Sequence, residues 1–417
     1  MPTRIRFKVL AFCIALGAVT YMDRVCISIT SPSIAKELGL SDTQMGFVFS
    51  IFTLAYGAFE IPTGWWGDRI GTRSVLTRIV IWWSAFTILT STAFNYVSLL
   101  IVRFLFGIGE AGAWPNAART FSRWFPISER GRAQGIFFTG AHGGGALTPI
   151  LVTTMLAYMS WRWVFVIFGF VGFIWAAAWY RWFRNEPREH PEVNAAELAL
   201  IEKGRGEAPS HDLHGVPWMK ILANRNVQLL CLQYFTQTYG FYFFITWLPS
   251  YLARERGFSA MKLGFFAALP LICCVIADIT GGITTDAFAR RFGPRKGKAI
   301  VAGSSFVIAA ICMLAGTAAQ DAKTAAVLLA LAAGWSAFLL GSAWSTCLDI
   351  AGPNTGVVSA FMNTAGQVGG MLSPVIIGFV LDQWKDWTMP LYLTGILFLV
   401  GAACWLFIDP RHKIQAH

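Results

Sequence analysis

The chain has 417 residues, of which 55% are hydrophobic and only 13% are charged. Water-soluble globular chains carry about 25% charged residues, so this composition excludes an ordinary soluble domain. A formal net charge of +11 can indicate a protein that binds nucleic acid. The basic residues are distributed over many short loops, however, and do not form one basic surface, so we expect no nucleic-acid partner. The composition predicts an all-α membrane protein embedded in a lipid bilayer.

Apolar runs long enough to cross a bilayer follow one another along the whole chain. Lysine and arginine concentrate in alternate loops between these runs, which places both termini and the long central loop in the cytoplasm by the positive-inside rule. We predict twelve membrane-spanning helices, at residues 7–29, 45–65, 74–94, 97–118, 133–158, 161–182, 227–252, 263–285, 299–317, 324–350, 357–381 and 391–408.

A long polar segment divides these spans into two blocks of six. We predict an N-terminal half at residues 1–184, a cytoplasmic linker at 185–225 and a C-terminal half at 226–417. Two motifs recur between the halves. The glycine-rich segment 64–73 is echoed from Gly282, and the glycine pattern from Gly131 to Pro149 is echoed from Gly356 to Pro374, at offsets of 218 and 225 residues. Two matches at nearly one offset indicate an internal repeat.

Four ionisable residues interrupt apolar spans. Asp23 and Arg24 lie in the first span, and Arg103 and Glu110 lie in the fourth. A charge inside the hydrocarbon costs at least about 2.5 kcal/mol, so such residues face one another, a cavity or a pathway. They are the primary candidates for function.

Depth along the helices suggests a role for the two arginines. The first span runs outward, and Arg24 lies about 25 Å along it, in the outer part of the membrane. The fourth span runs inward, and Arg103 lies about 9 Å from its outer end. Both guanidinium groups can therefore lie at one level of the membrane. A guanidinium fork suits a carboxylate. We therefore interpret Arg24 and Arg103 as a clamp for an anionic substrate.

The two acids suggest proton coupling. Glu110 lies two helical turns beyond Arg103, where a low dielectric favours a neutral carboxyl that can carry a proton. Asp23 is expected to hold Arg24 while ionised and to release it when protonated. The alternative is a static network of buried ion pairs.

A hydroxylated anion also needs neutral polar contacts around the clamp. For each candidate the alternative is an interhelical hydrogen bond with no contact to substrate. The candidates are Tyr21, Tyr56, His142, Gln233, Gln237, Tyr242, Trp344, Asn363 and Gln367.

The segment 64–73, its echo and the two blocks of six spans resemble the major facilitator superfamily. Four further segments resemble its anion:cation symporter family: Tyr-Met-Asp-Arg at 21–24, and segments 103–110, 187–191 and 242–251. The resemblance implies a monomeric, multi-pass protein of the bacterial inner membrane that imports an organic anion with protons by alternating access. Where sugar-acid members often have glutamine early in the fifth span, this chain has Ala141 and His142.

The resemblance also implies a conformational gate at the cytoplasmic edge, where an acid can bond a helix N-terminus and nearby arginines. The gating candidates are Asp68, Arg69 and Arg73, with Asp286 and Arg290 as the second latch. Glu60 is expected in the first network, and the role of Asp278 is open between packing and a second proton site.

A sugar acid such as a hexonate, hexuronate or aldarate is favoured as substrate, because the candidate contacts are rich in tyrosine, glutamine and asparagine. An organophosphate or other carboxylate antiporter and a non-transporting sensor are the alternatives. The organophosphate antiporters place a second arginine in span seven, and residues 227–248 contain no basic residue. No catalytic residues, metal or cofactor are expected, and we interpret the eight cysteines as apolar packing.

Overall fold

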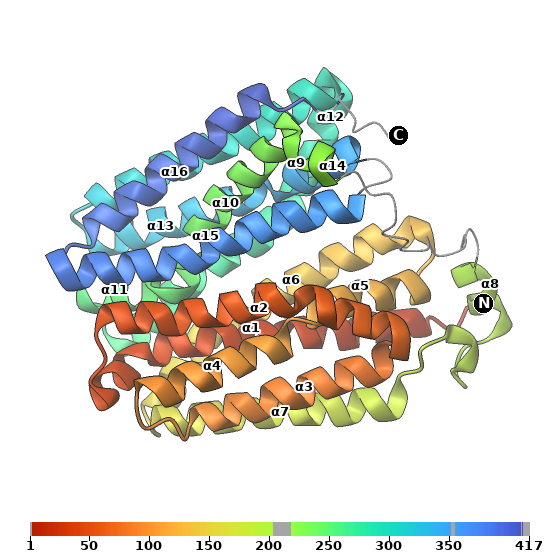
Figure 1. The fold of residues 1–417 in the computed structure, drawn as a ribbon, viewed down its shortest axis with the longest axis horizontal. Coiled ribbons are helices and arrows are strands. Elements are labelled where there is room, and N and C mark those ends of the chain that lie inside the picture. Colours follow the sequence, from red (N-terminus) through yellow and green to blue (C-terminus); the bar gives the residue numbers. More distant parts are fainter. Residues whose placement is uncertain (1, 203–217, 352–354, 410, 412–417) are drawn as a thin grey trace. The chain divides into compact units, whose positions relative to one another are not determined.

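The computed structural model describes residues 2–202, 218–351, 355–409 and 411, and these residues form helices and no strands (Figure 1). Up to the linker the helices are α1 Ile5–Leu38, α2 Asp42–Ile70, α3 Thr72–Thr90, α4 Tyr96–Glu110, α5 Ala113–Trp124, α6 Ile127–Leu156 and α7 Trp161–Trp182. The linker contains the 3-10 turn η1 Pro187–Glu189 and α8 Ala195–Glu202. The later helices are α9 Trp218–Ala223, α10 Arg225–Thr246, α11 Leu248–Arg254, α12 Ala260–Ala318, α13 Ala322–Phe338, α14 Leu340–Ala351, α15 Thr355–Trp384 and α16 Thr388–Phe407.

Each predicted span coincides with helical structure, but three spans are broken and two are joined. The fourth span is broken between α4 and α5, the seventh between α10 and α11, and the tenth between α13 and α14. The eighth and ninth spans are joined in α12, which is kinked at Gly293 where φ is 79°. A positive φ of this kind is open to glycine at little cost, so the turn between the two spans needs no loop.

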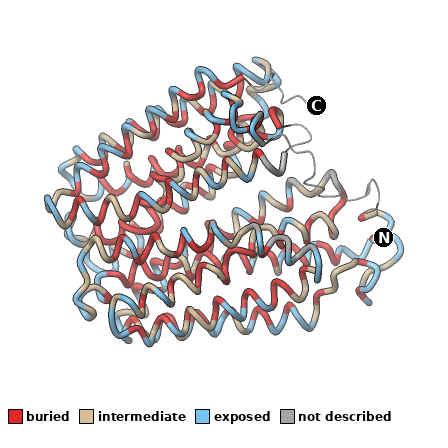
Figure 2. The backbone as a smooth tube through the Cα atoms, in the orientation of Figure 1, coloured by how far each residue is buried: buried red, intermediate tan, exposed pale blue. Residues whose placement is uncertain are grey.

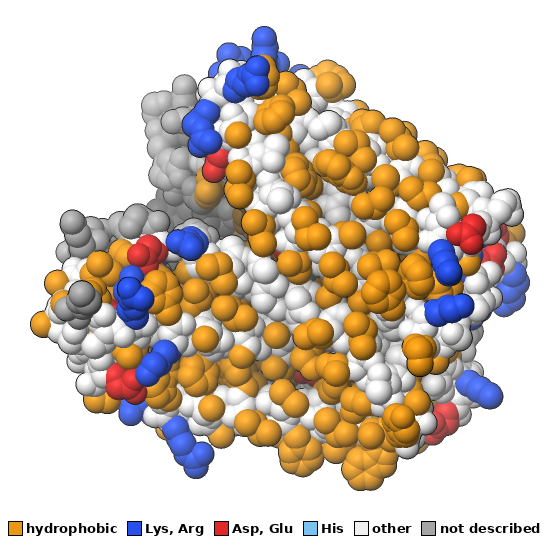
Figure 3. All heavy atoms as spheres, turned by 180° about the vertical axis from the view of Figure 1, so that it is seen from behind, with side chains coloured by type: hydrophobic (Ala, Val, Ile, Leu, Met, Phe, Trp, Pro, Cys, Tyr) orange, Lys and Arg blue, Asp and Glu red, His pale blue; other side chains and the backbone are white. Residues whose placement is uncertain are grey.

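Large apolar side chains cover the outside of the helices. Ile174 is 70% exposed and Ile283 is 65% exposed, and Figure 3 shows apolar side chains over the middle of the helices with most charged ones near helix ends. Contiguous apolar surface of this extent is rare on soluble monomers. Eight of the described helical segments are long and apolar enough to cross a membrane.

The chain divides into two compact units, and the following description treats each separately. Unit 1 comprises the described residues of Met1–Thr30, Ile51–Thr148 and Met155–His211. Unit 2 comprises those of Ser31–Ser50, Pro149–Thr154 and Asp212–His417.

Aromatic packing holds unit 1 together. Trp83, Trp124 and Trp179 are fully buried, and α3 packs against both α4 and α7. Buried and exposed positions alternate along the helices (Figure 2). The Trp175 indole donates a hydrogen bond of 2.9 Å to the Phe12 carbonyl, which joins α7 to α1. These rings fix α1 and α4 in place around the candidate site.

The N-terminal end of α1 is held by a carboxylate from the linker. Glu197 is fully buried and accepts hydrogen bonds from the Ile5 and Arg6 amides at 2.8 and 3.1 Å. Its side chain also accepts from the Thr3 hydroxyl and the Arg6 guanidinium, and Arg6 is ion-paired with Glu129 at 2.9 Å. The first amides of a helix have no partner within the helix, so Glu197 completes the first turn of α1.

Unit 2 has its own apolar core. Leu230, Phe306, Met362 and Phe398 are each fully buried and come from α10, α12, α15 and α16. In the same unit, the Trp247 indole donates to the Pro374 carbonyl at 3.0 Å.

Candidate functional site

The local sequence of α4 sets the positions of its two charged residues. Asn95 accepts from the Ser98 amide at 2.8 Å and forms a capping box that starts the helix. Arg103 lies two turns further on and is buried, and α4 ends at Glu110, where Ala111 and Gly112 separate it from α5. Glu110 therefore sits at a helix C-terminus, whose partial negative charge opposes a carboxylate.

Arg24 and Glu110 form a buried ion pair that joins α1 to α4 within unit 1. The Arg24 Nε donates to Glu110 Oε1. The Glu110 side chain is fully buried, whereas that of Arg24 is 11% exposed. The other carboxylate oxygen of Glu110 has no hydrogen-bond partner among the described residues. A buried acid that is only half satisfied is unusual in a structural role.

Asp23 differs from the sequence-based expectation. It does not hydrogen-bond Arg24, and neither of its carboxylate oxygens has a partner among the described residues. Consecutive side chains on a helix point in different directions, so Asp23 and Arg24 do not face each other. Asp23 is buried within electrostatic reach of Arg103 and Glu110. The Trp83 indole is a near neighbour, but the two groups do not reach hydrogen-bond geometry.

Aromatic rings surround both guanidinium groups. The Arg24 guanidinium lies 4.7 Å from the Tyr56 ring centroid and 5.1 Å from that of Phe52. The Arg103 guanidinium lies 4.6 Å from the Phe106 centroid and 5.3 Å from that of Phe52. The two arginines of the expected clamp thus share one neighbourhood in unit 1.

Two further candidates lie in the same part of unit 1. Tyr21 contacts the Arg24 guanidinium at 5.5 Å and packs edge-on against His142, with ring centroids 5.3 Å apart. Trp114 also packs edge-on against Tyr21, with ring centroids 6.3 Å apart. His142 occupies a buried position on α6, so α1, α2, α4 and α6 all contribute side chains here.

The remaining neutral candidates lie in unit 2. Gln233, Gln237 and Tyr242 are buried on α10, and Trp344, Asn363 and Gln367 are half-buried on α14 and α15. The Gln233 side-chain amide donates to the Leu230 carbonyl at 3.1 Å, and its oxygen has no partner among the described residues. That oxygen could accept a hydrogen bond from a substrate hydroxyl.

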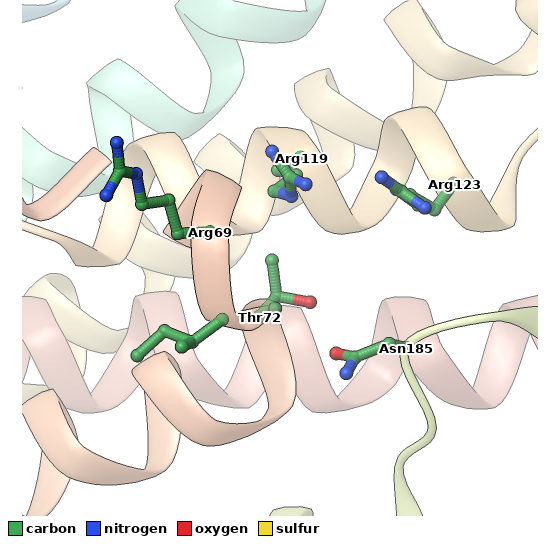
Figure 4. Close-up of a pocket in the computed structure, with 7 residues that line it drawn as sticks. Arg69, Thr72, Arg119, Arg123 and Asn185 are labelled. Atoms are coloured by element: carbon green, nitrogen blue, oxygen red, sulfur yellow. The ribbon is translucent and has the colours of Figure 1, made fainter. Parts of the chain in front are cut away.

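A cavity of about 290 Å³ lies where α2 ends and α3 begins (Figure 4). Arg69 from α2 and Arg119 and Arg123 from α5 line it, together with Ile70, Gly71, Thr72 and Asn185. Arg123 is ion-paired with Glu186 of the linker. Of the gating candidates, Arg69 belongs to this basic cavity.

The other gating candidates have different surroundings. Arg73 donates to the Tyr180 carbonyl through Nε at 2.9 Å and Nη2 at 2.6 Å, so it caps the end of α7 inside unit 1. Asp286 and Arg290 are exposed on α12. The side chain of Asp68 lies outside the described residues. Glu60 and Asp278 are half-buried.

Aromatic residues of the site were not among the sequence-based candidates. Phe52, Phe106, Trp83 and Trp114 all lie against the charged or polar side chains described above. Aromatic residues in apolar spans carry no signal of their own. The spacing of Phe52 and Tyr56 could have identified one of them, because residues four apart lie on the same face of a helix.

Comparison with known families matches residues 13–374 to the Major Facilitator Superfamily. A probable sulfoacetate transporter of Cupriavidus necator, SauU, is 35% identical over 99% of this chain and 95% of that protein. A probable galactarate/D-glucarate transporter of Escherichia coli, GarP, is 30% identical over 97% and 94%, respectively. The hexuronate transporter of Bacillus subtilis is also 30% identical, over 98% and 96%.

Among solved structures, a bacterial homologue of the human lysosomal transporter Spinster, in an inward-facing and unoccupied conformation, has a TM-score of 0.80. It is 19% identical, with 97% of this chain and 96% of that chain covered. At that identity the likeness establishes the fold alone. The family resemblance drawn from the motifs is confirmed: the chain belongs to the major facilitator superfamily and is a multi-pass membrane transporter whose relatives are named as transporters of organic anions.

Proposed function

We propose that this protein imports an organic anion together with protons, by alternating access of the halves 1–184 and 226–417. The observation that carries the proposal is the pairing of Arg24 with Glu110 beside an acid, Asp23, that accepts no hydrogen bond from the described residues. Two buried guanidinium groups favour an anion over a neutral sugar. Two incompletely satisfied buried acids supply sites for protons.

The contacts support an exchange of partners at Arg24. While Glu110 is ionised, it occupies Arg24, and the helix end at Glu110 opposes the negative charge. Protonation of Glu110 weakens the ion pair, so that a substrate carboxylate can take its place on Arg24, with Arg103 as the second cation. Loss of the proton on the other side of the membrane restores the ion pair and expels the anion. Asp23 modulates the same cycle through Arg103, which lies within its electrostatic reach.

A sugar acid, namely a hexonate, hexuronate or aldarate, is the substrate class that we propose. Its hydroxyl groups would bond Tyr21, Tyr56 and His142 in unit 1. In the C-terminal half they would bond Gln233, Gln237, Tyr242, Trp344, Asn363 and Gln367. Relatives at 30% identity named for galactarate, D-glucarate and hexuronates support this class.

A short sulfonate is the second candidate substrate. The relative named as a probable sulfoacetate transporter is more similar in sequence, at 35% identity. A sulfonate and a carboxylate on one small molecule would match two guanidinium groups directly. Tyr21 packs edge-on against both Trp114 and His142, and an aromatic surface of this kind suits a short anion with few hydroxyl groups.

The location follows from the same proposal. We propose that the protein is a monomer in the bacterial inner membrane. The loop charges support a cytoplasmic position for both termini. Asp68, Arg69 and Arg73 would act as a gate on that side, with Asp286 and Arg290 as the second latch. The basic cavity that Arg69 lines supports a role for this end of α2 in the gate.

Uptake into proteoliposomes tests the function. An inward proton gradient should drive accumulation of a labelled anion above its equilibrium level, and a protonophore should abolish the accumulation. Uptake that requires a second anion inside would favour the antiporter. No uptake of any acid, with intact binding, would favour the sensor and exclude symport.

Competition assays identify the substrate. D-glucarate, galactonate, glucuronate, tartrate, phthalate and sulfoacetate would each be added to the uptake mixture. We expect a sugar acid to compete most strongly. If sulfoacetate alone competes, the short-sulfonate alternative is correct.

A further inference from the structure

Phe52 is the aromatic ring that both arginines share. Among the described residues, its centroid lies 5.1 Å from the Arg24 guanidinium and 5.3 Å from that of Arg103. The ring is 4% exposed, so water does not screen these contacts. A desolvated guanidinium is attracted to the face of an aromatic ring, and the attraction is stronger in a dry site than at a surface.

A close approach between the α2 and α4 backbones brings the Phe52 ring near α4. A Cβ atom added at Gly107 would lie 2.6 Å from the Phe52 carbonyl oxygen, a separation that real side chains do not reach. The glycine therefore lets the α4 backbone approach α2 at the level of Phe52. Phe106, the neighbour of that glycine, packs on the Phe52 ring with centroids 5.4 Å apart, and Tyr56 lies at 6.0 Å.

The two arginines carry like charges and repel each other. In the proposed transport cycle, protonation neutralises the Glu110 carboxylate that is hydrogen-bonded to Arg24. When Glu110 is protonated, the attraction of Glu110 for Arg24 falls, while the attraction of a neutral ring for both cations does not depend on pH. An aromatic quadrupole at this position can therefore keep the two guanidinium groups together through the step in which the anion binds.

We propose that Phe52 is a positioning residue that holds Arg24 and Arg103 side by side for one anion. The proposal rests on the proposed transport of an organic anion at these arginines. It assigns Phe52 no contact with the substrate. It predicts that affinity for the anion depends on the electron density of the ring and not merely on its size.

Replacement of Phe52 by mono-, di- and trifluorinated phenylalanine tests this assignment, because fluorine withdraws electron density with little change of shape. The same series at Phe121 is the control. Phe121 is a buried phenylalanine of unit 1 that packs against Phe125 and Phe137. Two quantities are measured for each variant: the melting temperature without anion, and KM and kcat for proton-driven uptake.

We expect the Phe52 series to raise KM stepwise, on the order of tenfold by the trifluorinated ring, with a smaller change in kcat, while the Phe121 series leaves KM unchanged. Phe52→Tyr should retain more affinity than Phe52→Leu. A KM that is flat across the Phe52 series would overturn the positioning role, whether or not the melting temperature changes. If the wild-type protein carries no anion, the proposed function fails and the positioning role fails with it.

Discussion

Glu197 of α8, Asp23 of α1 and Glu110 of α4 are all buried in unit 1, but their hydrogen bonding differs. Glu197 accepts hydrogen bonds from Thr3, Ile5 and Arg6 on both carboxylate oxygens. Asp23 accepts none from the described residues, and Glu110 uses only one oxygen. Buried polar groups with a structural role are normally saturated. The difference supports our assignment of Glu197 to the stability of the fold, and our proposal that Asp23 and Glu110 carry protons.

Glu197, whose two carboxylate oxygens are both hydrogen-bonded, also has a shifted pKa. Burial raises the pKa of Glu197, but the hydrogen bonds from Thr3, Ile5 and Arg6 together outweigh burial, so that its pKa lies below the ordinary value. The ionised form is therefore the one that the fold selects. Five experiments test this contrast between the two regions.

Arg24→Ala should have the largest effect. It leaves Glu110 buried without its ion-pair partner, and loss of one partner of a buried pair lowers stability by about 3–5 kcal/mol. It also removes one of the two guanidinium groups proposed to bind the anion, and loss of a charged hydrogen-bonded contact of up to about 3 kcal/mol should lower uptake by up to about 100-fold. The double variant Arg24→Ala with Glu110→Gln should recover thermal stability but no uptake. Wild-type uptake by the single variant would show that Arg24 does not bind the anion.

Asp23→Asn should abolish proton-driven accumulation while leaving the fold intact. Because Asp23 accepts no hydrogen bond from the described residues, the amide breaks no contact, and we expect the melting temperature to change by no more than about 2 °C. Exchange of labelled for unlabelled anion without a gradient should persist. A large loss of stability would instead identify Asp23 as part of a static network.

Glu197→Gln should show the reverse pattern. Loss of its charge-assisted hydrogen bonds should cost about 1–3 kcal/mol, which lowers the melting temperature by about 3–10 °C, with uptake at permissive temperature unchanged. Glu202→Gln is the matched control, because Glu202 lies on the same helix and makes an exposed ion pair with Arg188. Equal melting temperatures for both variants would contradict the structural role.

Acidification should reproduce part of that effect in the wild-type protein. The ordinary glutamate pKa is about 4.3, and the folded-state pKa of Glu197 is lower. Its contribution is fully present above the unfolded-state value and is lost as pH falls through the folded-state value. Melting curves between neutral pH and pH of about 3 should therefore converge for wild type and Glu197→Gln. A constant difference across that range would exclude this linkage.

Lys8→Ala should have the smallest effect. Lys8 pairs with Glu192 at 2.7 Å, but the two side chains are 60% and 44% exposed. Water and salt screen such exposed pairs, so both melting temperature and uptake should stay near wild-type values. A loss comparable to that of Glu197→Gln would show that exposure does not distinguish the two contacts.

The sequence was sufficient to locate the helices and the charged residues of the site. Apolar runs of membrane-crossing length give helix positions directly, because lipid leaves the backbone no other partner for its hydrogen bonds. Asp23, Arg24, Arg103 and Glu110 stood out for a similar reason, since a charge in hydrocarbon is too costly to persist without use. The breaks in the fourth and tenth spans carried no comparable signal, because apolar composition continues through them.

Pairing within the site depended on the packing of the helices. Asp23 and Arg24 are neighbours in the sequence, but the direction of each side chain around α1 sends Arg24 to Glu110 and leaves Asp23 near Arg103 and Trp83. Phe52 could not be distinguished from the other phenylalanines of the spans until α2 and α4 were brought together at Gly107. The free energy of moving a side chain from water into lipid depends on the residue type, so it can be judged from the sequence. Partner choice is a property of three-dimensional proximity and emerges only when the helices pack.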